Sequence, residues 1–177
     1  WRVLAMGMAS EPDLEGLYDA HAAALYAFGV SLTRSPADTC DLMQDLFLKL
    51  ARDPAMLRGV RDERSFLLRL LRNAAIDLFR RGAVRAAHSE PLPEEVEAVF
   101  APASDPDEGA LRESLAKALL SLPGEQAEVL HLKLWEGLTF EQIANVLGIP
   151  ANTAASRYRY GLDKMRDRLR PLYEELP

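Results

Sequence analysis

The stretch LTFEQIANVLGIPANTAASRYRYGLDKMRDR, residues 138–168, decides the fold of the second half of this chain. Thr139 and Gln142 have the spacing of a capping box at a helix N-terminus. Gly148 suits the left-handed position that ends a helix, and Pro150 suits the first turn of the next one. Between them, four apolar residues at helical spacing form one face: Phe140, Ile143, Ala144 and Leu147. The pattern predicts two helices joined by a very short turn, a helix-turn-helix.

The second of these helices is predicted to have two faces. Its inward face consists of Ala154, Tyr158, Leu162, Met165 and Leu169. Its outward face consists of Asn152, Ala155, Ser156, Arg159 and Tyr160. Small polar residues at a helix N-terminus, followed by arginines, suit contacts with bases and phosphates in the major groove of DNA. The alternative is an ordinary helical hairpin with a solvated polar face.

Composition restricts the class of protein. The chain has 177 residues, enough for one domain or two small ones, and 49% of them are hydrophobic. Long helical periods recur, whereas alternating β-branched runs are nearly absent, so the predicted fold class is all-α. The single cysteine, Cys40, excludes an intramolecular disulfide framework and favours a cytoplasmic protein. No apolar run has membrane-spanning length, and residues 1–10 lack a signal-peptide cleavage pattern.

The negative charge is concentrated in one segment. Residues 87–114 carry a net charge of −7, whereas residues 1–86 carry +1 and residues 115–177 are neutral. The overall charge of −6 therefore does not argue against nucleic-acid binding. The acidic segment contains prolines and no sustained periodicity, which predicts a flexible linker over residues 86–109. This linker divides the chain into two small helical modules, residues 11–85 and 110–172.

Two amphipathic helices are predicted at the start of the first module. The predicted helix at residues 14–31 has an apolar stripe that continues to Leu32 and is marked by Leu14, Leu17, Tyr18, His21, Leu25, Phe28 and Leu32. Ser35 and Pro36 begin the next helix as its cap and first residue. Its predicted core side consists of Leu42, Met43, Leu46 and Leu50, and another face of Asp41, Gln44, Asp45 and Leu48. That acidic face, with its exposed leucine, is either a solvated surface or a docking surface for a partner.

A third helix, residues 63–81, is rich in arginine. Its predicted inward residues are Leu67, Leu70, Leu71, Ala74 and Leu78, and its outward residues are Ser65, Arg69, Arg72, Asn73, Ile76 and Arg80. Residues 58–85 contain eight arginines and no lysine against three acidic residues. Arginine suits planar contacts with phosphates and base edges, although a solvated helix face is the alternative. In the second module, residues 125–136 are predicted to form a helix with Leu130 and Leu134 inward.

Patterns that would indicate catalysis or metal binding are absent. His21, His88 and His131 lie on separate segments without partners at metal-ligand spacing, and His21 is predicted to be a core histidine. The sequence contains neither G-x-x-x-x-G-K-[ST] nor G-x-G-x-x-G. We therefore expect no catalytic residues, no metal site and no cofactor, and an enzyme is the least favoured class.

Three stretches, in order, resemble one protein family. DLMQDLFLK, residues 41–49, resembles the D-L-x-Q-[DE]-x-F-L-[KR] segment of bacterial sigma factors. SFLLRLLRNAAIDLFRR, residues 65–81, resembles their W-L-x-R-I-x-R-N-x-A-I-D-x-x-R-R segment. Leu122-Pro123, residues 128–130, GLTFEQIA at 137–144 and LGI at 147–149 resemble their promoter-binding module. The order, spacing and linker resemble the extracytoplasmic-function (ECF) group of the sigma-70 family, which keeps only regions 2 and 4.

The resemblance implies core RNA polymerase, promoter DNA and an anti-sigma factor as partners. It assigns Asp41, Gln44, Asp45 and Leu48 to the surface that docks on the polymerase clamp helices. It assigns the basic third helix to recognition and opening of the −10 element, with Arg69, Arg72, Asn73, Arg80 and Arg81 facing DNA. It assigns Thr153, Ser156, Arg157 and Arg159 to the helix that enters the −35 element, where the outward face adds Asn152 and Tyr160. The linker would thread through polymerase.

Several positions depart from the family pattern. Phe66 stands where tryptophan is common, Pro150 replaces the usual Ser or Thr cap, and Ala154 and Ala155 stand where valine and lysine often occur. The −35 sequence therefore does not follow from these residues. The competing hypothesis is a helix-turn-helix regulator that binds an operator and uses its N-terminal helices to dimerise or to sense a ligand. The docking face and the arginine cluster favour a sigma factor, because a simple repressor needs neither.

Overall fold

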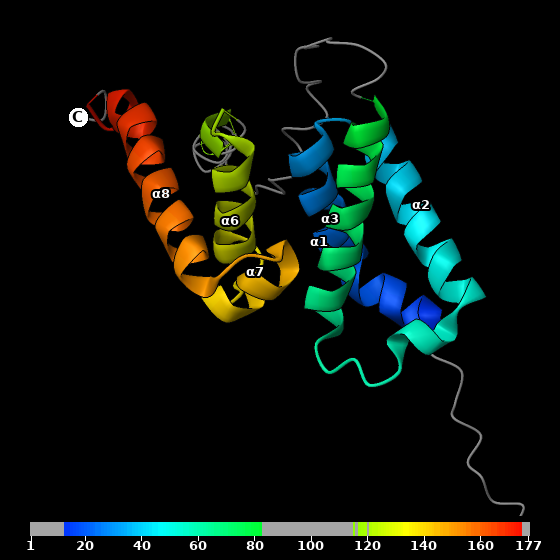
Figure 1. Ribbon diagram of the computed structural model, residues 1–177. Coiled ribbons are helices and arrows are strands. Elements are labelled where there is room, and N and C mark those ends of the chain that lie inside the picture. Colours follow the sequence, from blue (N-terminus) through cyan, green and yellow to red (C-terminus); the bar gives the residue numbers. More distant parts are fainter. Residues whose placement is uncertain (1–12, 83–114, 116, 120, 175–177) are drawn as a thin grey trace, which may run out of the picture.

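The computed structural model of the chain describes residues 13–82, 115, 117–119 and 121–174. Within this part every regular element is a helix, which confirms the all-α prediction (Figure 1). The first module consists of α1 (Leu14–Thr33), α2 (Pro36–Arg52), the short 3₁₀ helix η1 (Pro54–Leu57) and α3 (Glu63–Gly82). The second contains α6 (Gly124–Leu134), α7 (Phe140–Leu147) and α8 (Ala151–Glu174). The predicted linker, residues 86–109, lies outside the described residues.

The predicted helix boundaries are confirmed by their caps. The Gln142 N–H donates to the Thr139 hydroxyl at 3.2 Å, and the Thr139 N–H donates to the Gln142 side chain at 2.9 Å, which completes the capping box. Gly148 ends α7 with a left-handed φ of 66°. Pro150 lies directly before α8, and its carbonyl accepts the first hydrogen bonds of that helix. The helix-turn-helix therefore has the geometry that its sequence predicts.

In the first module, α1 and α2 cross at a glycine. Gly29 is buried against Thr39, which is itself fully buried and donates its hydroxyl to the Ser35 carbonyl at 2.9 Å. A Cβ at position 29 would lie 2.5 Å from the Thr39 Cγ2 and 3.4 Å from the Leu71 Cδ2. The absence of a side chain at Gly29 therefore sets the distance between the two helices.

We expect Gly29→Ala to destabilise the protein by about 1–3 kcal/mol, because the added methyl group forces α1 and α2 apart. This loss should exceed the gain of roughly 1 kcal/mol in helix propensity. Gly124→Ala is the matched control, since a Cβ there meets no atom within 4 Å. Urea unfolding of both variants measures the difference. Equal stability of the Gly29 and Gly124 variants would show that the crossing can widen without loss.

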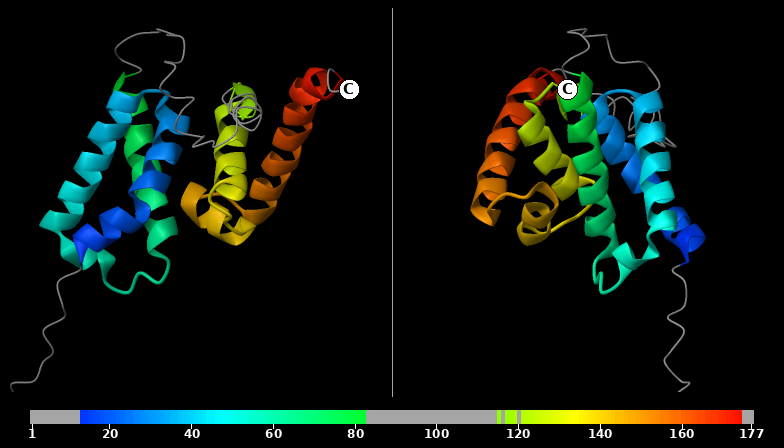
Figure 2. Two further views of the ribbon diagram at one scale, coloured as in Figure 1. Left: turned by 180° about the vertical axis from the view of Figure 1, so that it is seen from behind. Right: turned by 45° about the vertical axis from the view of Figure 1, so that its right-hand side comes forward.

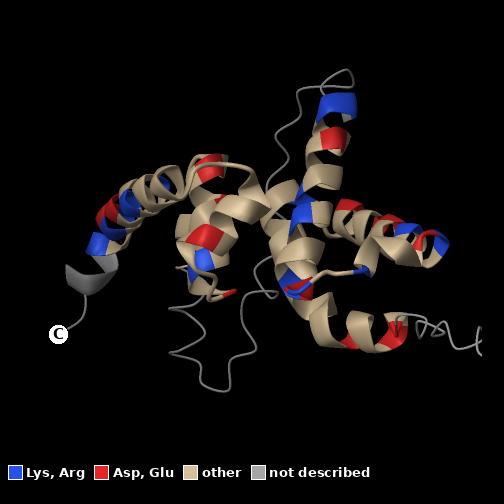
Figure 3. Cartoon of the chain, turned by 60° about the horizontal axis from the view of Figure 1, so that its bottom comes forward, with Lys and Arg blue, Asp and Glu red and all other residues tan. Residues whose placement is uncertain are grey.

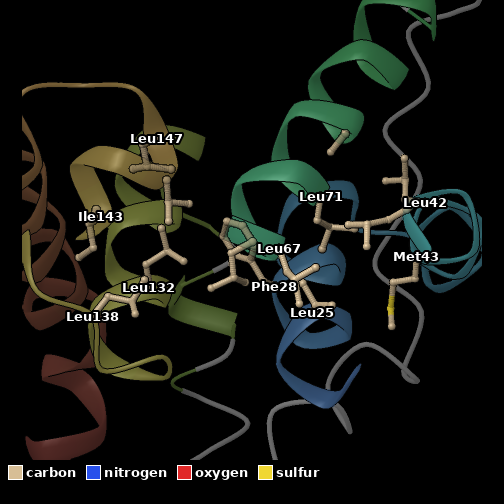
Figure 4. Close-up of a cluster of buried hydrophobic side chains, with 14 of the residues drawn as sticks. Leu25, Phe28, Leu42, Met43, Leu67, Leu71, Leu132, Leu138, Ile143 and Leu147 are labelled. Atoms are coloured by element: carbon tan, nitrogen blue, oxygen red, sulfur yellow. The ribbon is translucent and has the colours of Figure 1, made fainter. Parts of the chain in front are cut away.

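The two modules share one hydrophobic core (Figure 4). Phe28 of α1 is fully buried, and in the close-up Phe28 and Leu67 lie between Leu132 of the second module and Leu42 and Met43 of α2. The helices in contact across the boundary include α1 with α6 and α3 with α7. The sequence does not indicate that the modules pack together in this way.

Two residues that were predicted to be buried are not: Leu134 in the second module and His21 in the first. Leu134 is 46% exposed, and His21 is only partly buried, with its Nε2 4.0 Å from a Glu63 carboxylate oxygen. The core histidine is His131, which is fully buried on α6. The reason is that α6 lies between α8 and the first module (Figure 2), so its consecutive residues 129–132 are all buried. Leu134, at the last position of α6, is not covered by either neighbour.

Candidate functional site

The outward face of α8 presents the side chains predicted to meet DNA. Asn152, Arg159 and Tyr160 are exposed, and Thr153 and Ser156 are partly buried at the start of the helix. The Arg159 guanidinium lies over the Tyr160 ring, 5.2 Å from its centroid. Several basic positions follow along α8, which forms one end of the molecule (Figure 3). The arrangement suits a helix whose first turns enter a groove and whose later turns lie near phosphates.

Arg157 is held within its own module. Its guanidinium pairs with the Glu125 carboxylate at 2.7 Å, and its side chain is 23% exposed. Glu125 lies in the first turn of α6, next to the break at Pro123-Gly124. The pair therefore links α8 to the first turn of α6. In this structure Arg157 is less available to DNA than Arg159.

On α3, four of the five predicted DNA-binding residues are exposed: Arg69, Asn73, Arg80 and Arg81. Arg72 is different. Its Nε donates to the Glu128 carboxylate at 2.8 Å, and a terminal nitrogen donates to the Leu147 carbonyl at 3.3 Å. Both acceptors belong to the second module, so in this structure Arg72 links the modules and is not directed to solvent.

A pocket of about 240 Å³ lies where the loop before α3 meets α7. The first module contributes Val60, Arg61, Asp62, Ser65, Phe66 and Arg69, and α7 contributes Gln142 and Asn145. The Arg69 guanidinium lies 5.7 Å from the centroid of the Phe66 ring. A cation beside an aromatic ring and side-chain amides suits an unstacked nucleobase and its phosphate. Ser65, predicted to face outward, is buried here because α7 covers this side of α3.

Two carboxylates in this region accept hydrogen bonds from the other module. The Asp62 carboxylate accepts from the Ser65 N–H at 3.0 Å and from the Gln142 amide at 2.8 Å. Glu136 is buried and accepts from Arg64 of α3 through Nε at 2.9 Å. Its other oxygen lies 3.5 Å from the His131 Nε2. His131 in turn stacks on Trp135 and packs against Phe28 of the first module.

Both carboxylates are held ionised. Burial acts to raise the pKa of Glu136, but hydrogen bonds from His131 and Arg64, with their charges, lower that pKa below 4.5. Burial likewise acts to raise the pKa of Asp62, and hydrogen bonds from Ser65 and Gln142 with the Arg64 charge lower it below 3.8. At neutral pH each carboxylate therefore accepts its hydrogen bonds as an anion.

A folded-state pKa below the unfolded value contributes stability that is present at neutral pH and lost as pH falls through the folded pKa. We therefore expect the free energy of unfolding to fall below about pH 4.5. Glu136→Gln should be less stable than wild type at pH 7 and should show a smaller fall on acidification. Urea unfolding at pH 7 and at pH 4 measures both. An unchanged pH dependence in this variant would mean that Glu136 does not carry the effect.

A second site lies on the opposite side of the first module. An open groove of about 960 Å³ runs between α1 and α2, and its lining is mostly apolar. Tyr18 and Leu48 are 47% and 45% exposed there, and the Tyr18 ring meets the Phe47 ring edge-on at 5.0 Å. Asp41 and Gln44 also line the groove, and Asp45 is exposed on the same helix. The face predicted to dock a partner is thus a formed apolar groove with an acidic rim.

Comparison with known proteins identifies the family. Residues 17–85 match the model of Sigma-70 region 2, and residues 118–167 match that of Sigma-70, region 4. The ECF RNA polymerase sigma factor SigL of Mycobacterium tuberculosis is 31% identical over 179 residues, which cover 97% of each protein. The chain belongs to the ECF sigma factors. It therefore directs promoter-specific initiation of transcription by RNA polymerase, binding core enzyme and promoter DNA.

Other similar proteins agree with this assignment. The ferric citrate uptake sigma factor FecI of Escherichia coli is 34% identical over 137 residues, covering 76% of this sigma factor and 78% of FecI. The sigma factor RpoE from Bartonella quintana, solved in complex with the anti-sigma factor NepR, has the same fold. Its TM-score is 0.71 at 22% identity, over 89% of this chain and 97% of that one. An operator-binding regulator does not account for both matched regions.

Some features of this sigma factor were missed by sequence reasoning. Arg64, Glu128 and Glu136 join the two modules, and none of the three was predicted to do so. The only signal was an equal spacing of eight residues between Arg64 and Arg72 and between Glu128 and Glu136. Among the described residues, no group of three His, Cys, Asp or Glu side chains is placed to hold a metal ion. None of the described helices is long and apolar enough to cross a membrane.

Proposed function

We propose that this ECF sigma factor docks on core polymerase through the groove between α1 and α2. The observation that carries this proposal is the coincidence of Asp41, Gln44 and Leu48 with that groove. An apolar groove with carboxylates at its rim suits a helical partner with an apolar stripe and basic flanks. The polymerase clamp helices are the partner that the family resemblance assigns to these residues.

We further propose that α3 reads and opens the −10 element. Arg69, Arg80 and Arg81 are exposed cations that can hold the DNA backbone, and the exposed amide of Asn73 can pair with a base edge. The pocket beside Phe66 and Arg69 has the side chains that a flipped base requires. Arg72 joins this surface once its contact with Glu128 is broken.

For α8 we propose contacts with the −35 element through its first turns. Asn152, Thr153, Ser156 and Arg159 lie along the end and the outward side of the helix, with Tyr160 beside Arg159. Arg157 is a positioning residue in this proposal, because its guanidinium pairs with Glu125 and links α8 to α6. The acidic linker, residues 86–109, threads through polymerase in this proposal.

The remaining parts of the proposal concern partners and chemistry. The protein has no catalysis of its own and acts in the cytoplasm, where polymerase and DNA are found. An anti-sigma factor is proposed as a partner, in keeping with the RpoE–NepR complex. The chemistry of the site consists of binding and strand opening.

Reconstitution with core polymerase tests the proposed function. The purified chain should bind core enzyme and support initiation from a subset of promoters in a genomic library, which start-site mapping would identify. A chain that fails to bind core polymerase, or that binds it without initiating at any promoter, would contradict the proposal.

A further inference from the structure

A glutamate of α6 binds an arginine of α8, the helix that is proposed to enter the −35 element. The Arg157 guanidinium pairs with the Glu125 carboxylate at 2.7 Å, and the two side chains are 23% and 72% exposed. Glu125 lies in the first turn of α6. A carboxylate at a helix N-terminus is stabilised by the helix dipole even without a cationic partner. Glu125 therefore does not need Arg157 to remain in place.

The two helices do not depend on this pair for their contact. α6 and α8 pack side by side (Figure 1), with Leu130 and Met165 buried in one apolar cluster. A Cβ at Gly161 would lie 2.7 Å from the Leu130 Cδ1, so the helices approach closely one turn beyond Arg157. The pair of Arg157 and Glu125 lies at the edge of this contact. Apolar packing thus holds α8 on α6, and the pair is available for another role.

Arg157 lies on one flank of the outward face of α8, and Arg159 lies on the other. Two residues turn an α-helix by about 200°, and Ser156 and Tyr160 occupy the face between the two arginines. A helix that lies in the major groove has a phosphate strand along each flank. α8 therefore carries one arginine for each strand. In the structure Arg159 is exposed with its guanidinium over the Tyr160 ring, whereas the Arg157 guanidinium is paired with a carboxylate.

A DNA phosphate can replace the Glu125 carboxylate on Arg157. Both groups are anions that accept the paired N–H donors of a guanidinium. Because Glu125 is largely in water, its pair with Arg157 contributes little to stability and is easily exchanged. Duplex DNA, in turn, presents one phosphate for about every 1.7 Å of its axis. Until the exchange takes place, the flank of α8 that carries Arg157 makes no contact with its phosphate strand.

We propose that Glu125 is an affinity-determining residue, which competes with a DNA phosphate for Arg157. The carboxylate lowers the affinity of α8 for duplex DNA of any sequence, because phosphate contacts carry no sequence information. Base contacts from the rest of α8 then contribute a larger share of the binding. The inference rests on the proposed contact of α8 with the −35 element, and it adds the group that limits this contact.

Binding of the full chain to a fluorescent 20-base-pair duplex of mixed sequence tests the competition. Glu125→Gln should raise the affinity about fivefold at low salt, because Arg157 is released to bind a phosphate. Asp19→Asn removes the same charge from an exposed position on α1 and should change the affinity less than about twofold. Equal effects of the two variants would overturn the proposal, since net charge alone would then explain them.

The salt dependence of the same binding separates a new phosphate contact from a change in local charge. The slope of log affinity against log salt concentration should become steeper by about 0.9 in Glu125→Gln, the change expected for one added contact with B-DNA. In the Arg157→Ala background, Glu125→Gln should leave this slope unchanged and raise the affinity less than about twofold. A gain of equal size with and without Arg157 would refute the competition, because the glutamate would then act on DNA directly.

Arg159→Ala in the same assay distinguishes failure of this inference from failure of the proposed function. It should weaken duplex binding severalfold, since Arg159 is an exposed cation on the outward side of α8. If Arg159→Ala has no effect, α8 does not bind the duplex, and the proposed contact of α8 fails together with the competition. If Arg159→Ala weakens binding but Glu125→Gln neither raises the affinity nor steepens the slope, the competition alone is refuted.

Discussion

Replacing Leu48 by glutamate should weaken binding of core polymerase by roughly 2 kcal/mol or more, at least about thirtyfold. Leu48 is 45% exposed in the groove between α1 and α2, so it is available to a partner and contributes little to the core. A carboxylate there would lose its hydration when the groove is covered. It would also lie on the same helix face as Asp41 and Gln44, where Asp41 already carries negative charge.

The Leu48→Glu variant should fold normally and keep its melting temperature, because the side chain is exposed. Arg52→Ala is the matched control, as Arg52 is exposed at the end of α2 outside the groove. Polymerase affinity is measured by fluorescence anisotropy of labelled sigma factor, and initiation is measured at saturating sigma factor. Wild-type affinity in the Leu48→Glu variant would place the polymerase contact elsewhere.

The helices and caps could be predicted because they depend on local sequence. The capping box of Thr139 and Gln142, the left-handed Gly148 and the Ser35-Pro36 start are each set by a few neighbouring residues. The buried stripe of α8 followed from its helical period, with Ala154, Met165 and Leu169 buried as predicted. Local rules therefore described the elements and the two faces of α8.

The contacts between the modules could not be predicted in the same way. Helical period assigns one inward face to each helix, yet α6 is covered from two sides, so His131 is buried at a position that the period does not mark. For the same reason Ser65 of α3 is buried under α7. Long-range packing decides these positions, and a single sequence does not contain a signal for which surfaces meet.

The arginines of α3 illustrate why DNA binding was easier to predict than which side chains are available for it in the free protein. Their number and spacing indicated contacts with phosphates. The same guanidinium groups bind carboxylates equally well, so the sequence does not distinguish a free DNA-binding face from one held by glutamates. In the structure Arg64 and Arg72 are held, whereas Arg69, Arg80 and Arg81 are exposed. Charge pattern alone thus predicted the ligand class and not which residues are available.

The exposed residues Arg159 and Asn73 allow DNA anchoring and strand opening to be separated. Arg159 lies on the outward side of α8 with its guanidinium over Tyr160, so it can reach duplex bases or phosphates. We expect Arg159→Ala to weaken closed-complex binding by about 1–3 kcal/mol if it makes a bidentate base contact. Asn73 is exposed on α3, where an amide can pair with an exposed base edge. Asn73→Ala should leave closed-complex binding nearly intact and slow strand opening.

A promoter with a pre-melted bubble distinguishes the two roles. Holoenzymes with each variant are compared on duplex and on bubble templates, with binding measured by filter retention and opening by permanganate reactivity. The bubble supplies the unpaired bases that Asn73 would otherwise help to capture, so the Asn73→Ala defect should shrink. It leaves the −35 duplex unchanged, so the Arg159→Ala defect should persist. Both residues are exposed, so neither change should alter the melting temperature. If both variants lose closed-complex binding equally and the bubble rescues neither, α3 and α8 do not divide the work of opening and anchoring.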